Sequence, residues 1–228
     1  MIFVIRGHIR NSFETKKLYN LIKKLHSVIP DLKIFIHTWN IFANNVSWRK
    51  INVDERIVTN ETIYEYFDDL KDLIQHIIID DDTKIQLCGN LTGKIGNSLM
   101  PVLGWKNYWY GKYRIIDYID NFSADKNETV VNCRFDVMNN SNSFNEQRII
   151  DFIKGKEGLD FKKNVFLFDD ENHTGIDNIY IGNVTTMYQL IRKFFYELDD
   201  INSKHKTIIN QEKLAFRVNS TMFDSTRK

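Results

Sequence analysis

The chain has 228 residues and a formal net charge of +1, and 43% of its residues are hydrophobic and 13% aromatic. This length and composition indicate one folded domain with a sizeable core, and they exclude a disordered chain. Because 31 basic residues are balanced by 30 acidic ones, the sequence lacks the excess positive charge on which nonspecific nucleic-acid binding depends. We therefore expect no nucleic-acid partner.

The cysteines and the N-terminal segment indicate where the protein acts. Cys88 and Cys133 are too few for a disulfide framework and lack the spacing of metal ligands, so we expect buried thiols in a reducing compartment. The first apolar run stops at Arg6, whereas a secretory signal needs about 7–15 apolar residues. No window approaches the ~20 apolar residues of a membrane span. We expect a soluble, cytoplasmic protein without a transmembrane segment.

Apolar runs predict strands, and apolar residues at helical spacing predict helices, in alternation along the chain. In chain order we expect a strand at 2–5, a helix through 18–25, a strand at 33–37, a helix at 59–77, a strand at 84–88, a helix at 104–119, a strand at 128–136, a helix at 145–155, strands at 164–168 and 178–182, and a helix at 187–198.

This alternation predicts a single α/β, Rossmann-like domain with a mostly parallel sheet flanked by helices. We assign the domain to residues 1–202 and expect a polar C-terminal tail at 203–228, with a short helix around 211–216. In such sheets ligands bind outside the carboxyl ends of the strands, near a topological switch point. The polar residues that follow the strands are therefore the candidate site residues.

The first predicted strand ends in Arg6, Gly7, His8 and Arg10. A glycine lets a ligand approach the backbone, and arginines suit a diphosphate because each guanidinium offers paired N–H donors. The alternative interpretation is a turn with solvated arginines. Both interpretations stay open from the sequence.

The second predicted strand ends in His37, Thr38 and Trp39. Thr38 and Trp39 are candidate ligand-binding residues at the same edge. The alternative is a core histidine with one hydrogen-bonded nitrogen, beside a tryptophan that serves only packing.

The third polar strand end is Arg134 and Asp136, after a very apolar strand. A carboxylate here suits a divalent cation that bridges phosphates, because hard cations take oxygen ligands. It suits equally a salt bridge to a neighbouring arginine. Further along, Asp177, Asp169 and Asp170 are candidate catalytic bases, although a solvated acidic loop explains the run at 169–171 as well.

Aromatic residues begin the helix after the long loop at 90–103. Trp105, Tyr108 and Trp109 are candidates to stack on a base or a sugar ring, and a core role is the alternative. The segment 93–103, with its glycines, is a candidate lid over the ligand.

Five motifs in one order carry a resemblance that runs thinly from residue 1 to about 200. The sequence resembles the glycosyltransferase-like proteins of surface-polysaccharide clusters, the group that includes WavE-type lipopolysaccharide synthesis proteins. The motifs are R-G-H-I-R at 6–10 with the Phe-Glu pair at 13–14, I-H-T-W at 36–39, W-Y-G-K-Y at 109–113, C-R-F-D at 133–136, and D-x-x-x-x-G-N at 177–183.

The resemblance implies a GT-A-like fold and a nucleotide-sugar donor. It implies that Arg6, Gly7 and Arg10 lie near the nucleotide, that Asp136 lies by the diphosphate and any Mn²⁺ or Mg²⁺, and that Asp177 faces the sugar or the acceptor. One departure weakens metal dependence. The usual metal motif has two aspartates one residue apart, and here Arg134 occupies the first of these positions.

The functional hypothesis is a glycosyltransferase that moves a sugar from a nucleotide-sugar to a glycan acceptor. Such an enzyme must stabilise a leaving diphosphate, deprotonate an acceptor hydroxyl and position both substrates. Two alternatives stay open: a catalytically silent nucleotide- or sugar-binding protein with the same fold, and an α/β protein-interaction module. The interaction module predicts a flat surface in place of a cleft.

Overall fold

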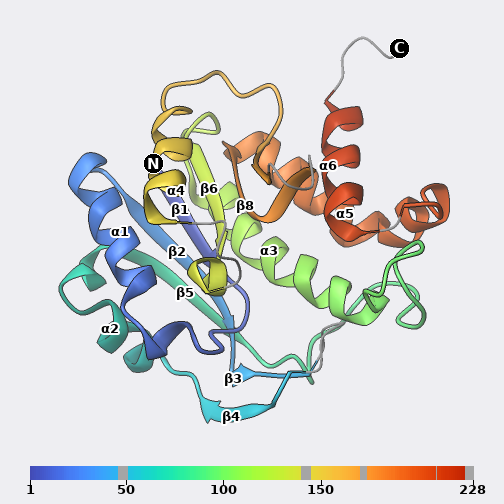
Figure 1. Cartoon of the computed structure of the whole chain (residues 1–228), viewed down its shortest axis with the longest axis horizontal. Helices are drawn as coiled ribbons and strands as arrows, with labels where there is room; N and C mark the ends of the chain where they lie inside the picture. The colour runs from blue at the N-terminus through green and yellow to red at the C-terminus, as the bar shows by residue number, and fades with distance from the viewer. Residues whose placement is uncertain (46–50, 140–144, 170–173, 209, 224–228) are drawn as a thin grey trace.

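The structure is a computed structural model that describes residues 1–45, 51–139, 145–169, 174–208 and 210–223 (Figure 1). At 168–169 and 174–177 only the backbone is described. A six-stranded sheet forms the centre of the described chain, and helices lie on both of its faces.

The strand order of this sheet is β5-β2-β1-β6-β8-β7, and its first four strands pair in parallel. β8 runs antiparallel to them, and β7, which pairs antiparallel with β8, runs in the same direction as the four. The predicted α/β fold with a mostly parallel sheet is therefore confirmed. A separate antiparallel pair, β3 with β4, follows β2. The strands are β1 (Ile2–Arg6), β2 (Lys33–Trp39), β3 (Ile41–Ala43), β4 (Asp54–Ile57), β5 (Ile74–Asp80), β6 (Thr129–Arg134), β7 (Val165–Asp169) and β8 (Thr174–Asn183).

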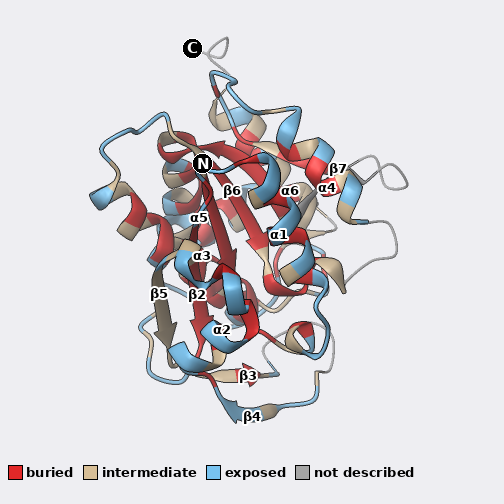
Figure 2. Ribbon diagram, turned by 90° about the vertical axis from the view of Figure 1, so that its left-hand side faces the viewer, coloured by how far each residue is buried: buried red, intermediate tan, exposed pale blue. Residues whose placement is uncertain are grey.

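The helices divide between the two faces of the sheet, as Figure 2 shows by the buried sheet between them. One face is covered by α1 (Lys17–Val28), α2 (Asn60–Phe67) and α4 (Glu146–Lys154). The other is covered by α3 (Val102–Phe122), α5 (Val184–Lys204) and α6 (Gln211–Met222). Three short 3₁₀ turns are η1 (Ser12–Glu14), η2 (Asp68–Leu73) and η3 (Phe135–Met138). Within the described residues, no helix is both long and apolar enough to cross a membrane.

The central strand β1 explains why the first predicted run forms a strand. All five of its residues are buried. Phe3 and Ile5 pack into the core beneath α1, while Ile2 and Val4 pack into the core beneath α3. A strand that is covered on both faces needs a continuous apolar run rather than an alternating one.

The last helix, α6, is tied to the sheet by buried amide groups. The Asn164 side chain donates to the Asn219 side-chain oxygen at 3.0 Å, and Asn219 donates back to the Asn164 carbonyl at 2.8 Å. Leu214 and Ala215 of α6 are fully buried. Because the buried amides satisfy one another, α6 packs on β8 without leaving these polar groups unpaired.

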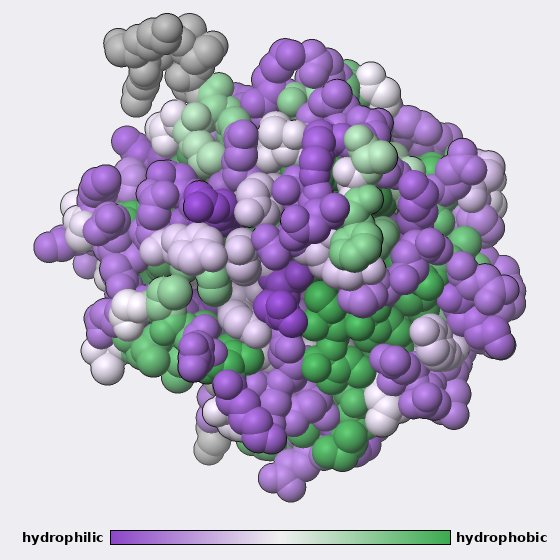
Figure 3. Space-filling view, turned by 180° about the vertical axis from the view of Figure 1, so that it is seen from behind, coloured by the Kyte–Doolittle hydropathy of each residue, from purple (hydrophilic) through white to green (hydrophobic). Residues whose placement is uncertain are grey.

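The structure differs from the sequence-based prediction between 68 and 88. The helix expected at 59–77 ends at Phe67, because Asp68 takes a left-handed φ of 51° and the chain continues as η2. Residues 74–80 form β5, and the strand expected at 84–88 is absent from this described segment. β5 is the edge strand of the sheet, and Figure 3 shows apolar side chains gathered on the face where it lies.

Candidate functional site

The carboxyl ends of β1 and β6 lie side by side, as the sequence hypothesis requires. The two strands pair in parallel, with Arg6 opposite Arg134, and β2 places His37 on the other side of Arg6. The chain moves from β1 outward to β2 and β5 and then returns to β6, so the strand order reverses at β1. Such a switch point is where open α/β sheets bind ligands.

The buried guanidinium of Arg6 places a positive charge just below this edge. Its Nε donates to Asn132 Oδ1 at 2.9 Å and its Nη2 donates to the Tyr108 hydroxyl at 2.8 Å. The guanidinium also lies 4.4 Å from the centre of the Tyr108 ring. Only 2% of Arg6 is exposed. The residue therefore contributes positive potential to the edge, while a ligand meets other side chains first.

Asp136 holds two further arginines at the surface of the edge. Its Oδ2 accepts from Arg10 Nη1 at 2.8 Å and from Arg134 Nη2 at 2.6 Å. Arg134 Nη1 also donates to Asn178 Oδ1 at 2.8 Å. Burial raises the pKa of Asp136, but the Arg134 and Arg10 charges outweigh burial and hold its pKa below the usual range. The carboxylate is therefore ionised and orients both guanidinium groups.

We call Arg6, Arg10, Arg134 and Asp136 together with Gly7 the arginine cradle. Three guanidinium groups against one carboxylate leave an excess of two positive charges. The Arg10 and Arg134 side chains are 27% and 21% exposed. The cradle thus presents partly exposed, fixed cations of the kind that recognise phosphate groups.

Gly7 gives the cradle a bare stretch of backbone. Its φ is +95°, a conformation that favours glycine, and a Cβ placed on it would meet nothing within 4 Å. Its N–H donates to the His37 carbonyl at 3.1 Å, and its own carbonyl accepts from the Thr38 hydroxyl at 3.0 Å. The backbone is thus fixed from the β2 side and open above Cα, which allows close approach of a ligand.

Arg10 also lies in the left-handed region, with φ 53°. The hydrogen bond from its N–H to the Phe42 carbonyl, 2.8 Å long, ties this turn to β3. Non-glycine residues in this region cluster at functional sites, because strain there persists only when surrounding contacts enforce it.

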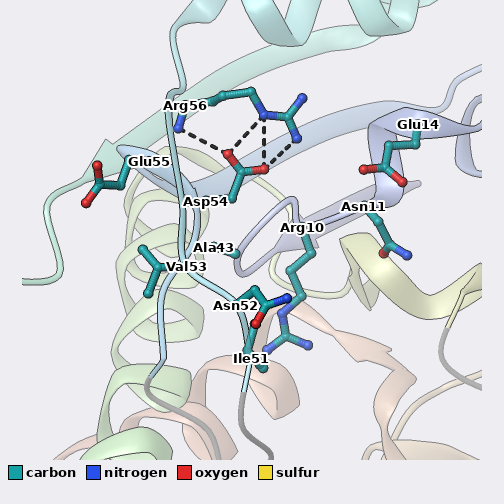
Figure 4. A pocket seen from close by; sticks show the side chains of 10 residues that line it. All are labelled: Arg10, Asn11, Glu14, Ala43, Ile51, Asn52, Val53, Asp54, Glu55 and Arg56. Carbon is teal, nitrogen blue, oxygen red and sulfur yellow. Dashed lines mark hydrogen bonds and ion pairs between the residues drawn. The ribbon is translucent and has the colours of Figure 1, made fainter.

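A surface depression adjoins the cradle at Arg10 (Figure 4). Its volume is about 780 Å³. The segment after β1 forms one wall and the segment that includes β4 forms the other. The lining residues are Arg10, Asn11, Glu14, Ala43, Ile51, Asn52, Val53, Asp54, Glu55 and Arg56. Because Arg10 belongs to both, the depression begins at the Arg10 end of the cradle.

The β2 and β5 half of the same edge is built around His37 and Asp80. Asp80 Oδ2 lies 3.3 Å from His37 Nε2 and accepts from Arg114 Nε at 3.1 Å. Burial acts to raise the pKa of Asp80, but the His37 and Arg114 contacts lower it to about 2. Burial lowers the pKa of His37. We therefore assign a neutral His37 whose Nε2–H donates to the Asp80 carboxylate.

Trp39 fills the space at the β2 and β5 half of the edge. Its ring lies between His8, with centroids 5.7 Å apart, and Tyr110, with centroids 5.9 Å apart. His8 Nε2 is 3.8 Å from Asp82 Oδ2, and both side chains are buried. Burial, and then the Arg10 charge, lower the pKa of His8 to about 3. The candidate binding residues His8 and Trp39 are therefore parts of a packed stack.

Several residues predicted to bind a ligand lie elsewhere or are enclosed. Trp105 and Trp109 are 1% and 0% exposed and stack on Phe194 of α5. The core role, not ring stacking on a ligand, is correct for them, because their helix face packs against α5. Thr38 is fully buried and acts on the Gly7 carbonyl.

The candidate lid at 93–103 is anchored away from the cradle. The Gly96 N–H donates to Asn202 Oδ1 at 2.6 Å, and the Asn97 N–H donates to the Ile208 carbonyl at 3.0 Å. These contacts fasten the loop to the end of α5 and the segment after it. None of these contacts supports a lid over the arginine cradle.

The candidate bases fall on or beside β7 and β8. Asp177 belongs to β8, and since Cys133 pairs with Ile179, Asp177 lies beyond that pair, toward the carboxyl end of β6. Asp169 is the last residue of β7 and pairs with Thr174. Asp170 lies outside the described residues. Only the backbones of Asp169 and Asp177 are described, so a catalytic role for all three stays a prediction.

The described residues do not fit a divalent metal. Across them, no group of three or more His, Cys, Asp or Glu side chains is placed to hold an ion. Asp136, the predicted ligand, already binds two arginines through one oxygen. We therefore derive no step through Mn²⁺ or Mg²⁺, and metal dependence stays a prediction.

Sequence reasoning missed several groups at this edge: Asp80, Asp82, Arg114, Asn132 and the contact of Tyr108 with Arg6. One signal was available. The three consecutive isoleucines at 77–79 are followed by three aspartates, and a short β-branched run with polar residues after it is typical of a buried strand and its carboxyl end.

No family model matches the chain, and no curated protein matches it. Among solved structures it is similar to LgtC, a galactosyltransferase, in complex with donor and acceptor sugar analogues, with a TM-score of 0.39 and 10% identity. It is also similar to an active-site mutant of LgtC, with a TM-score of 0.41 and 9% identity. Both alignments cover 96% of this chain and 70% of the other. At these values the similarity says nothing about substrate or residue roles.

Proposed function

We propose that the protein is a glycosyltransferase, which moves a sugar from a nucleotide-sugar donor to a glycan acceptor. The observation that carries this proposal is the arginine cradle at the switch point of the sheet, where Arg10 and Arg134 bind one carboxylate, with the buried Arg6 guanidinium and the bare backbone of Gly7 beside them. The motif order that resembles the surface-polysaccharide proteins supports the same class.

The cradle suits the chemistry at the leaving group. When the bond from the sugar C1 to the diphosphate oxygen breaks, its electron pair stays with the nucleoside diphosphate, and negative charge grows on the phosphates. Arg10 and Arg134 are held by Asp136 where they can donate to those oxygens. Arg6 adds buried positive charge beneath them. Fixed cations stabilise developing charge because they need little reorganisation during the reaction.

A catalytically silent nucleotide-binding protein is the second candidate. Asp136 is engaged in two ion pairs, so it does not act as a reactive group. The cradle then has the groups to bind phosphates but no group to catalyse transfer, which favours this candidate. The third possibility, an interaction module, predicts a flat surface beside Arg6, Asp136 and Asp177. The depression of about 780 Å³ adjoins this region at Arg10, although none of those three residues lines it.

The test is nucleotide binding by calorimetry and thermal shift, with UDP, GDP, CMP and their sugar conjugates. We expect one nucleotide group to bind the wild type. Arg134→Ala should weaken it about 30-fold, because a hydrogen bond to a charged group contributes about 2 kcal/mol. Arg217→Ala, at an exposed arginine on α6, is the matched control and should bind as the wild type does.

Two outcomes contradict the proposal: no binding of any nucleotide to the wild type, or equal affinity in the Arg134→Ala and wild-type proteins. Binding that is never followed by turnover of any donor in the panel identifies the silent protein instead.

A further inference from the structure

We propose that the depression beside Arg10 binds the acceptor sugar and that Glu14 is the base that deprotonates its reacting hydroxyl. This inference rests on the proposed function, since it places the second substrate next to the diphosphate. The volume of about 780 Å³ falls within the range of small-molecule sites. Arg10 lines the depression and also binds Asp136 of the cradle, so an occupant lies beside the bond that breaks.

The chemistry of the lining favours a ligand rich in hydroxyl groups. Asn11 and Asn52 offer amide donors and acceptors, and Glu14 offers a carboxylate. Ile51 and Val53 supply apolar surface. No aromatic side chain is among the described lining residues, whereas single-stranded nucleic acids are held largely by aromatic stacking of their bases. A sugar ring, with polar edges and a small apolar face, fits this set.

Glu14 is the carboxylate of the depression that remains available. Asp54 is already occupied, because its two oxygens accept from the Arg56 backbone and guanidinium. Figure 4 shows the Glu55 side chain turned away from the depression and the Glu14 carboxylate turned into it. Glu14 is exposed, and its carboxylate has no hydrogen bond or ion pair within the described part of the chain.

The acceptor O–H gives its proton to the Glu14 carboxylate, and the oxygen forms a bond to C1 of the donor sugar. The bond from C1 to the diphosphate oxygen breaks, and its electron pair leaves with the nucleoside diphosphate, where Arg10 and Arg134 meet the new charge. Attack from the side opposite the leaving group inverts the configuration at C1.

Two pairs of variants test the proposal on the full chain. Val53→Trp fills the depression from an exposed position, and Ile57→Trp, at an exposed position of β4 outside the lining, is its control; these side chains are 51% and 65% exposed. Saturation-transfer NMR would follow a panel of methyl hexosides and N-acetylhexosaminides, with the nucleotide that binds the wild type present at saturation. We expect Val53→Trp to lose the glycoside signals and Ile57→Trp to keep them, with nucleotide affinity unchanged in both.

The second pair concerns the proton. Glu14→Gln still hydrogen-bonds a hydroxyl but does not accept its proton, so we expect glycoside signals within twofold of the wild type and transfer to the bound glycoside slower by a factor of about 100 or more. Glu65→Gln, at an exposed glutamate on α2, should react at the wild-type rate.

Failure of this inference is distinct from failure of the proposed function. If the wild type binds nucleotide but no glycoside, or if Val53→Trp keeps the signals, the depression is not the acceptor site, although the nucleotide site stands. If Glu14→Gln transfers sugar at the wild-type rate, Glu14 is not the base. If no nucleotide binds, both proposals fall together.

Discussion

The edge of the sheet at the carboxyl ends of its parallel strands has two halves, which use similar residues for different purposes. In the β1 and β6 half, Arg10 and Arg134 share the carboxylate of Asp136, remain partly exposed, and lie beside open space at Gly7. In the β2 and β5 half, the Asp80 carboxylate contacts a fully buried histidine, His37. One half gathers two partly exposed arginines at one carboxylate, whereas the other places its carboxylate between the buried His37 and a single arginine, Arg114, whose side chain is 44% exposed.

This difference separates a binding surface from a structural anchor. A group that recognises a ligand must be held in position and yet remain accessible. The arginine cradle meets both conditions at Arg10 and Arg134, because Asp136 holds both guanidinium groups and both side chains stay partly exposed. The His37 and Trp39 cluster meets only the first condition, since Trp39 is enclosed by His8 and Tyr110. Changes in the two halves should therefore affect different measurements.

The largest effect is expected for Asp136→Ala. Removing this buried carboxylate leaves two guanidinium groups without their shared partner, and breaking a buried pair from one side costs about 3–5 kcal/mol. Urea unfolding should show a loss of that size, and nucleotide affinity should change as well because the arginines lose their orientation. Asp120→Ala, which breaks a surface pair with Lys126, is the control and should change stability little. Equal losses in the two variants would place Asp136 outside any such role.

A smaller effect, confined to stability, is expected for Gly111→Ala in the closed half. The added Cβ would lie 2.7 Å from His37 Nδ1 and Cε1. Overpacking of this kind costs about 2 kcal/mol, and thermal unfolding should then shift down by about 4–8 °C. Nucleotide affinity, measured by calorimetry, should stay within twofold of the wild type. A large loss of affinity with unchanged stability would show that the two halves are not separate in function.

The most gradual effect concerns pH. The unfolded chain protonates His8 near its ordinary pKa of 6.5, whereas the folded chain does not until about pH 3. Stability is therefore full above pH 6.5 and falls as pH drops toward 3, by about 1.4 kcal/mol per pH unit for one such group. His37, whose pKa is also lowered, acts in the same direction. His8→Gln should make the fall in unfolding free energy between pH 6 and 4 less steep by about that amount. An unchanged slope would mean that His8 is protonated or exposed in the folded protein.

The sequence predicted the centre of the sheet better than its edge. β1, β2 and β6 are short apolar runs that end abruptly in polar residues. Their pattern therefore predicts both the strands and the edge of the sheet at which polar residues gather. The sequence predicts a helix through the start of β5, because Ile63, Phe67, Leu70, Leu73 and Ile77 keep helical spacing. What ends the helix is the backbone turn at Asp68, and residue spacing does not reveal such a turn.

The candidate site was predicted in its position but only partly in its members. The hypothesis that Arg6, Arg10 and Asp136 lie at one diphosphate requires β1 beside β6, and the structure pairs these strands with Arg6 opposite Arg134. Burial could not be predicted in the same way. Tyr108 and Trp109 are neighbours on α3, yet the first reaches Arg6 and the second stacks on Phe194. Only the packing of α3 against α5 and the sheet decides which of them faces the edge.

The amide pair between Asn164 and Asn219 sets a practical limit on shortening the protein. A chain cut before Gln211 would remove Leu214 and Ala215 from the core and leave the Asn164 carbonyl without its hydrogen bond from Asn219. Such a truncation removes part of the wall behind the sheet, and insolubility on expression is the expected result. Affinity tags are therefore better joined beyond Met222 than substituted for the last helix.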